Sequence, residues 1–172
     1  MFLNYFKNFY IKKYVKNKLS NVTNLFQNAK VTTVGILVDE TLFNKKEALI
    51  DQLINNGIDV NNIRLLVFKD KIQKKETYNY PIFSQSDLSL IGKIINKDAE
   101  AFIAEPFDLL INYYDLEKVS LIIVTNESKA KFKVGFESID KRLNHFIIES
   151  KIEDYGIFVT ELFKYLKILN KI

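Results

Sequence analysis

The sequence predicts a single α/β domain, an open three-layer sandwich with a mostly parallel sheet of about five strands. Short apolar runs rich in β-branched residues alternate along the chain with longer segments of helical periodicity. The first two of these runs enclose one helical segment between Val31 and Phe68. That length fits a strand–helix–strand unit, which requires a parallel strand pair and a right-handed crossover.

The domain is expected to span residues 29–172, after a basic helical arm at residues 1–28. Residues 1–30 hold six lysines and no acidic residue, which leaves 19 basic and 21 acidic groups in the rest of the chain. The net charge of +4 therefore originates in the arm, and the domain is close to neutral. In the arm, aromatic residues recur every four positions and so share one side of a helix: Phe2, Phe6, Tyr10 and Tyr14.

The first half of the domain starts with residues 31–38, which are apolar and β-branched as in a strand buried on both faces. A helix is expected at 42–56, because apolar residues recur at helical spacing and Gly57 supplies a C-terminal stop. A second buried strand is predicted at 63–68. The lysine-rich segment 71–81 is expected to be an exposed loop.

The segment that follows, residues 82–97, fits either a strand or a short helix capped by Ser84 or Ser86, and we favour the helix. Asp98 is expected to cap another short helix that ends at Ile103.

The second half of the domain contains the third strand, 107–113, and a helix at 116–126. The alternating pattern of "AKFKVGF" indicates a fourth strand, and "LNHFIIE" a fifth. The clearest helix is 154–170, where apolar residues recur at three and four positions. Ser150 and Glu153 are spaced as a capping box for it.

Composition and motifs exclude several kinds of site. The chain has no cysteine, which excludes disulfides, thiolate metal sites and thiol catalysis. His145 is the single histidine, and we interpret it as a half-buried strand residue, which disfavours a zinc site or a catalytic triad. No phosphate-binding glycine motif occurs, so a dinucleotide site is disfavoured although the expected sheet is Rossmann-like. Gly135 is interpreted as structural, at a bulge or a close backbone approach. We expect no metal and no cofactor.

The candidate ligand site follows from the parallel sheet, because ligands of such sheets bind beyond the carboxyl ends of the strands. Carboxylates at these strand ends could divide the roles of general acid and general base, which is the basis of an enzymatic alternative. The structural alternative is that Asp39 and Asp115 cap helices and that the tyrosines close the core. The candidate residues are Asp39, Glu40, Lys69, Asp70, Asn112, Tyr113 and Asp115.

The arm has three interpretations. It could lie in an anionic membrane surface, where lysines and aromatic side chains both contribute to binding. Single-stranded nucleic acid is the less favoured partner, since no nucleic-acid motif accompanies the lysines. We slightly favour the third interpretation, in which the arm packs on the domain. The candidate contacts for a membrane or polyanion are Phe2, Phe6, Lys7, Phe9, Lys12, Lys13 and Lys16.

Together these observations favour a non-enzymatic binding or scaffolding domain that binds an unidentified small molecule or a partner. We expect a cytoplasmic location, because neither a secretory signal nor a membrane-spanning apolar run is evident. A peripheral contact with the membrane through the arm is compatible with that location. The alternative is an enzyme of glycosyltransferase-like or nucleotide-binding type, with its site at the carboxyl edge of the sheet. The oligomeric state is not predicted.

Four segments of the sequence, "VGILVDE", "FDLLINYYD", "SKAKFKVGF" and "ELFKYLKILNKI", resemble a family of uncharacterised proteins from Bacteroidetes, a domain of unknown function. The resemblance covers nearly the whole chain and implies no activity, so it assigns no catalytic residue. A fainter likeness links "FDLLIN" and "KAKFKVG" to strand–helix–strand segments of heptosyltransferase-like proteins. It lies in apolar strand positions that many α/β folds share, and is an analogy of fold only.

Overall fold

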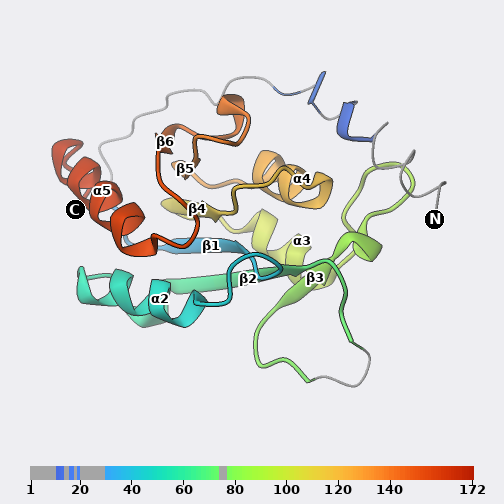
Figure 1. Ribbon diagram of the computed structural model, residues 1–172, viewed down its shortest axis with the longest axis horizontal. Coiled ribbons are helices and arrows are strands. Elements are labelled where there is room, and N and C mark those ends of the chain that lie inside the picture. Colours follow the sequence, from blue (N-terminus) through green and yellow to red (C-terminus); the bar gives the residue numbers. More distant parts are fainter. Residues whose placement is uncertain (1–10, 14–15, 18, 20–29, 74–76) are drawn as a thin grey trace.

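The computed structural model describes residues 11–13, 16–17, 19, 30–73 and 77–172. In these residues one sheet has six strands in the order β3-β2-β1-β4-β5-β6, and every neighbouring pair is parallel (Figure 1). The strands are β1 (Val34–Asp39), β2 (Ile63–Lys69), β3 (Ile82–Ser84), β4 (Leu109–Tyr113), β5 (Lys133–Phe136) and β6 (Phe146–Ile148).

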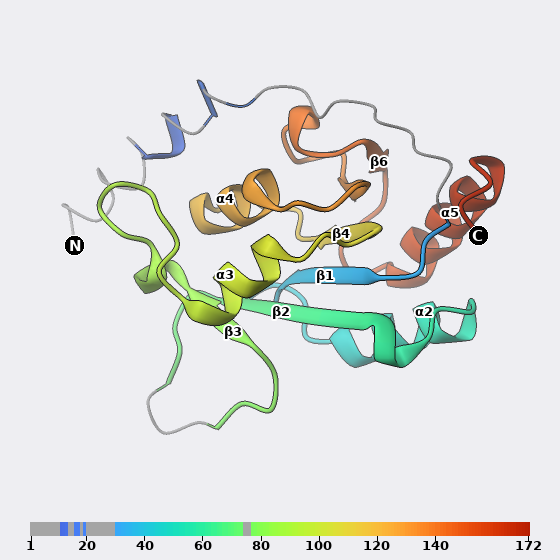
Figure 2. The same ribbon diagram turned by 180° about the vertical axis from the view of Figure 1, so that it is seen from behind.

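Four helices connect and cover the strands (Figures 1 and 2). They are α2 (Lys46–Asn55), α3 (Lys97–Ala104), α4 (Val119–Glu127) and α5 (Tyr155–Ile168). Three short 3₁₀ helices lie in the connections: η1 (Val60–Asn62), η2 (Gln85–Asp87) and η3 (Lys141–Leu143).

Neighbouring residues of β4 show that both faces of the sheet are covered. The Tyr113 ring contacts Phe158 of α5, with ring centroids 5.1 Å apart. Asn112 points to the opposite face, since side chains alternate along a strand, and there it accepts a hydrogen bond from Thr125 of α4. α2 packs with α5, and α3 with α4. The strands between these two helix layers are therefore apolar along almost their whole length.

The predicted α/β class with a largely parallel sheet is confirmed, but the sheet has six strands and not about five. The additional strand is β3, in the segment where a short helix was favoured. That helix is also present in part, because η2 follows β3 directly and Ser84 caps it in a capping box with Asp87. The remaining predicted strands and helices are present with shifted ends.

Two predicted helix caps are wrong. Ser150 and Glu153 do not form a capping box for α5, whose N-cap is Asp154 without a side-chain hydrogen bond. Asp98 does not cap α3, because the Asn96 side chain accepts the hydrogen bond from the Ala99 N–H. Asp98 instead lies in the first turn of α3, where a negative charge still complements the helix dipole.

The described part of the arm packs on the domain. Ile11 and Leu19 are 8% and 7% exposed and belong to the hydrophobic core. The ammonium groups of Lys12 and Lys16 lie 3.1 and 2.7 Å from Glu117 Oε2. The candidate contacts Phe2, Phe6, Lys7 and Phe9 lie outside the described residues.

Asp108 joins the amino ends of three adjacent strands. Its carboxylate accepts hydrogen bonds from the N–H groups of Thr32 and Thr33, just before β1, at 3.0 and 2.9 Å. Lys131, just before β5, donates to the other oxygen at 2.8 Å. Burial opposes ionisation of Asp108, but these bonds outweigh it and lower its pKa to about 2.

We predict that Asp108→Asn lowers the free energy of unfolding at pH 7 by about 1–2 kcal/mol. Because the folded-state pKa lies below the ordinary value of 3.8, this stabilisation is present above that pH and is lost as the pH falls toward 2. Urea unfolding at several pH values measures the difference, with the exposed Asp51→Asn in α2 as control. An effect of Asp108→Asn that is constant between pH 2 and 7 would contradict the account.

Candidate functional site

The carboxyl edge of the sheet holds a switch in strand order, because β1 pairs with β2 on one side and with β4 on the other. In open parallel sheets, ligands bind outside the carboxyl ends near such a switch. The seven predicted site residues do lie at or next to these ends. Their side chains, however, separate into an ion-paired group on each face, a pair directed into the core, and Asp115.

The first group is an ion-paired chain of Asp39, Lys118 and Asp70. Asp39 is fully buried, and its Oδ2 lies 2.7 Å from the Lys118 ammonium, which also lies 2.9 Å from Asp70 Oδ1. The Asp39 contact is an ion pair without hydrogen-bond alignment. Lys118 also lies 5.0 Å from the centroid of the Phe68 ring, a cation–π contact. The predicted capping role of Asp39 is wrong, since its Oδ1 accepts from the Thr41 N–H in the turn before α2.

The second group surrounds Glu40, on the opposite face. Glu40 is bonded by the ammonium of Lys46, lies 2.9 Å from that of Lys69, and accepts a hydrogen bond from the Tyr80 hydroxyl at 3.0 Å. Burial raises the pKa of Glu40, but the bonds from Lys46, Lys69 and Tyr80 outweigh it and lower the pKa below its usual value. The loop after β2 is thereby joined to the start of α2, and both carboxylate oxygens are occupied.

Asn112 and Tyr113 are directed into the interior. Asn112 donates to Asn144 Oδ1 at 2.7 Å and accepts from the Thr125 hydroxyl at 2.9 Å. The Tyr113 hydroxyl donates to the Ile152 carbonyl at 2.7 Å. These two residues form part of the interior beneath the carboxyl edge and cannot contact a ligand in solvent, since both are at most 1% exposed.

Because Gly135 has no side chain, the Asn144 side chain can occupy the space beside it. A Cβ atom at Gly135 would lie 2.5 Å from Asn144 Nδ2, so an alanine there would displace the asparagine. Gly135 is therefore structural, as interpreted, but the group that comes close to it is a side chain and not the backbone. His145, next to Asn144, lies just before β6 and is half-buried, and its Nδ1 accepts a hydrogen bond from the Lys133 N–H at 2.9 Å.

Lys133 is a buried amine that belongs to the fold. It is 5% exposed and donates to the Thr125 carbonyl at 2.6 Å, in the last turn of α4. Burial lowers the pKa of Lys133 to about 8. Because a positive charge is favourable at the C-terminus of a helix, Lys133 stabilises the end of α4.

A hollow with a volume of about 470 Å³ lies beyond the carboxyl ends of β4, β5 and β6. We call it the acidic hollow, since four carboxylates and one lysine line it. Among the described residues none of the four carboxylates forms an ion pair. The lining residues are Asp115, Glu137, Ser138, Glu149, Ser150, Lys151, Ile152 and Glu153.

The rim of the acidic hollow is held by hydrogen bonds between the strand ends. The Ser138 hydroxyl, after β5, donates to the Asp115 carbonyl at 2.8 Å, and the Glu137 N–H donates to the Ile148 carbonyl of β6 at 3.2 Å. Burial raises the pKa of Asp115 above its ordinary value, and the negative charges of Glu153 and Asp39 add to this effect. With four carboxylates and one lysine, Lys151, the lining of the hollow has an excess of negative charge. Asp115 is not the cap of α4, whose N-cap is Lys118.

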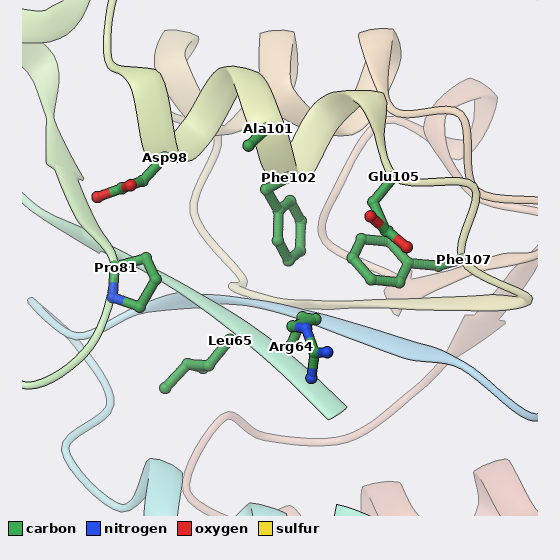
Figure 3. A pocket seen from close by; sticks show the side chains of 8 residues that line it. All are labelled: Arg64, Leu65, Pro81, Asp98, Ala101, Phe102, Glu105 and Phe107. Carbon is green, nitrogen blue, oxygen red and sulfur yellow. The ribbon is translucent and has the colours of Figure 1, made fainter. Parts of the chain in front are cut away.

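A second, smaller hollow of about 230 Å³ lies beside α3 (Figure 3). The rings of Phe102 and Phe107 form its apolar wall, and Arg64 lies below the Phe102 ring. Asp98 and Glu105 lie at opposite ends of α3 on its rim (Figure 3). The Arg64 guanidinium donates to backbone carbonyls of Asn61 and Ile63, so this arginine has local partners. The charges at this hollow are mixed, in contrast to the acidic hollow.

Sequence reasoning missed most of the acidic hollow. Glu137 and Glu149 come directly after β5 and β6, just as Asp39 ends β1, so the same rule applied to β5 and β6 could have selected them. No local sequence pattern identifies Lys118 as a site residue, because its role depends on Asp39 and Asp70, which are distant in sequence. Within the described ranges, no group of three or more acidic or histidine side chains has a metal-binding arrangement. None of the helices described is long and apolar enough to cross a membrane.

Residues 7–169 match the family described as "Family of unknown function (DUF6913)". The chain belongs to this family, which confirms the resemblance to an uncharacterised domain. Comparison with curated proteins and with solved structures finds no match. The family carries no activity to transfer, so an assignment of function depends on the geometry of the site.

We predict that Lys118→Met destabilises the protein by about 3 kcal/mol, because it leaves the carboxylate of Asp39 buried without its counter-charge. The double variant Asp39→Asn/Lys118→Met should recover most of this loss, since the asparagine oxygen can still accept from the Thr41 N–H. Urea unfolding measures both, and Lys164→Met, in an exposed pair on α5, is the control with little effect. Equal destabilisation by the single and double variants would show that the ion pair is not the cause.

Proposed function

We propose that this member of the DUF6913 family is a binding domain that takes a cationic group into the acidic hollow. The observation that carries the proposal is a contrast in charge pairing. At the ends of β1 and β2, Asp39, Glu40 and Asp70 each have a lysine within 2.9 Å. At the ends of β4, β5 and β6, the four carboxylates of the hollow have no such partner among the described residues.

Physical chemistry favours an amine or guanidinium as the missing partner. Carboxylates brought together at one edge repel each other. Burial is the main cause that raises the pKa of Asp115, and the negative charges of Glu153 and Asp39 raise it further. A ligand with positive charge removes the repulsion and gains charge-assisted hydrogen bonds. The ligand classes that fit are polyamines and lysine- or arginine-rich peptides. An anionic nucleotide is disfavoured by the same charges.

The sheet supports a ligand-binding role at this place. Its strand order, 3-2-1-4-5-6 with all strands parallel, supports a Rossmann-like sheet, and ligands of such sheets bind outside the carboxyl ends. The glycine-poor turn after β1 supports a ligand other than a dinucleotide. A cytoplasmic location is part of the same proposal, as expected from the sequence.

The enzymatic alternative rests on Asp115, whose raised pKa would suit a general acid at a carboxylate pair. Two other carboxylates considered for this role, Asp39 and Glu40, are occupied by lysines. Binding is therefore the preferred function, and the response to spermidine and to nucleotide sugars distinguishes it from the enzymatic alternative.

We predict that spermidine stabilises the protein and that nucleotides and nucleotide sugars do not. At a ligand concentration of 100 times Kd, the free energy of unfolding should rise by about 2.7 kcal/mol, which thermal unfolding detects as a shift of several degrees. The shift should decrease with added salt and at acid pH, because salt screens the carboxylates and protonation of Asp115 removes a charge. Glu137→Gln/Glu149→Gln should abolish it.

The matched control is Glu161→Gln, which changes a carboxylate on α5 whose partner is Lys164. This variant should retain the full spermidine shift. A shift with nucleotide sugars that Asp115→Asn removes, without any response to spermidine, would favour the enzymatic alternative and overturn the proposal.

A further inference from the structure

The segment between η2 and α3 contains a tight turn, residues 88–94, that we call the apex turn. Its ends, Leu88 and Ile94, form an antiparallel bridge and are 2% and 1% exposed. The Ser89 N–H donates to the Lys93 carbonyl at 2.9 Å, and the Lys93 N–H donates back to the Ser89 hydroxyl at 2.9 Å. The turn is thus fixed by its own hydrogen bonds and by two buried anchors.

The tip of the apex turn exposes two adjacent aliphatic side chains. Leu90 is 82% exposed and Ile91 is 85% exposed, the highest values for large hydrophobic side chains in the described part of the chain. Ile95, just beyond the turn, is 59% exposed. A single exposed aliphatic residue is ordinary, whereas two at the tip of an anchored turn form an apolar protrusion.

We propose that the apex turn inserts Leu90 and Ile91 into the surface of an anionic membrane. A convex tip of two side chains buries far less than the roughly 1,200 Å² of a specific protein–protein interface. A lipid surface, in contrast, accepts a small apolar protrusion at the boundary between headgroups and acyl chains. The apex turn and the acidic hollow share no residue.

Two exposed lysines lie beside the apex turn, together with the exposed Asp98 and Glu100 in the first turn of α3. Lys93, within the turn, is 68% exposed and lies 3.8 Å from Glu100, a distance at which the pair is weak and screened. Lys97, at the start of α3, is exposed as well. Lysines near an anionic membrane add electrostatic attraction to apolar insertion.

The basic arm reaches the same place. A Cβ atom at Gly92 would lie 3.2 Å from a methyl group of Ile11, so this residue of the arm lies against the turn. Lys13, two residues further along the arm, is exposed. Lys13 therefore adds one positive charge on the side of the apex turn.

The chain has no tryptophan, so Leu90→Trp introduces a single reporter of insertion. With phosphatidylcholine vesicles that contain phosphatidylserine, its emission should shift to the blue and be quenched by brominated lipid. Ile168→Trp, 64% exposed on α5 and far from the apex turn in Figures 1 and 2, should show neither change. In co-sedimentation, Leu90→Ser/Ile91→Ser should lower the partition coefficient by about tenfold.

The matched control for co-sedimentation is Ile157→Ser/Ile168→Ser, which removes two exposed isoleucines from α5 and should bind as the unchanged protein does. Absence of vesicle binding by the unchanged protein would overturn the proposal. Vesicle binding without any spectral response of Leu90→Trp would overturn it too, since the arm alone would then be the contact. Self-association in lipid-free solution that Leu90→Ser/Ile91→Ser abolishes would replace the membrane with a second copy of the chain.

Discussion

Burial of the sheet on both faces is the constraint from which the rest of the structure follows. Every residue of β1, β4 and β5 is buried, so charge is confined to the strand ends or must be held by specific partners. At the amino ends, Asp108 is bonded by residues before β1 and β5. At the carboxyl ends, Asp39 and Glu40 require lysines, because an unpaired buried charge costs several kcal/mol.

The ends of β4, β5 and β6 differ because they open toward solvent, which tolerates carboxylates without counter-ions. In a buried pair such as Asp39–Lys118 the carboxylate is already bound to a lysine and has little charge left to bind a ligand. A solvated group of carboxylates stabilises the fold less, but its charges remain able to bind a cationic ligand. In this chain the two halves of the carboxyl edge therefore serve different purposes, with structural pairs on one side of the switch and a candidate cation site on the other.

Hydrophobic periodicity was sufficient to predict the central strands and the class of fold, since strands covered on both faces appear as continuous apolar runs. β3 was missed because three residues carry too little pattern to distinguish a strand from a helix. The strand-end rule located Asp39 and Asp115 at the carboxyl edge but could not show that Asn112 is directed inward, which depends on Asn144 and on the space that Gly135 leaves. The ion pairs depend on tertiary contacts, and no local pattern encodes Lys118 as the partner of Asp39.

The acidic hollow holds four carboxylates without an ion-paired lysine among the described residues, and the titration of Asp115 in solution measures how strongly neighbouring charge acts on it. A pH titration followed by NMR of the side-chain carboxyl carbons should give a pKa above the ordinary value of 3.8. Glu153→Gln should lower that pKa because it removes a neighbouring negative charge, and added spermidine should lower it as well. A pKa of Asp115 at or below 3.8 that responds to neither change would contradict the account.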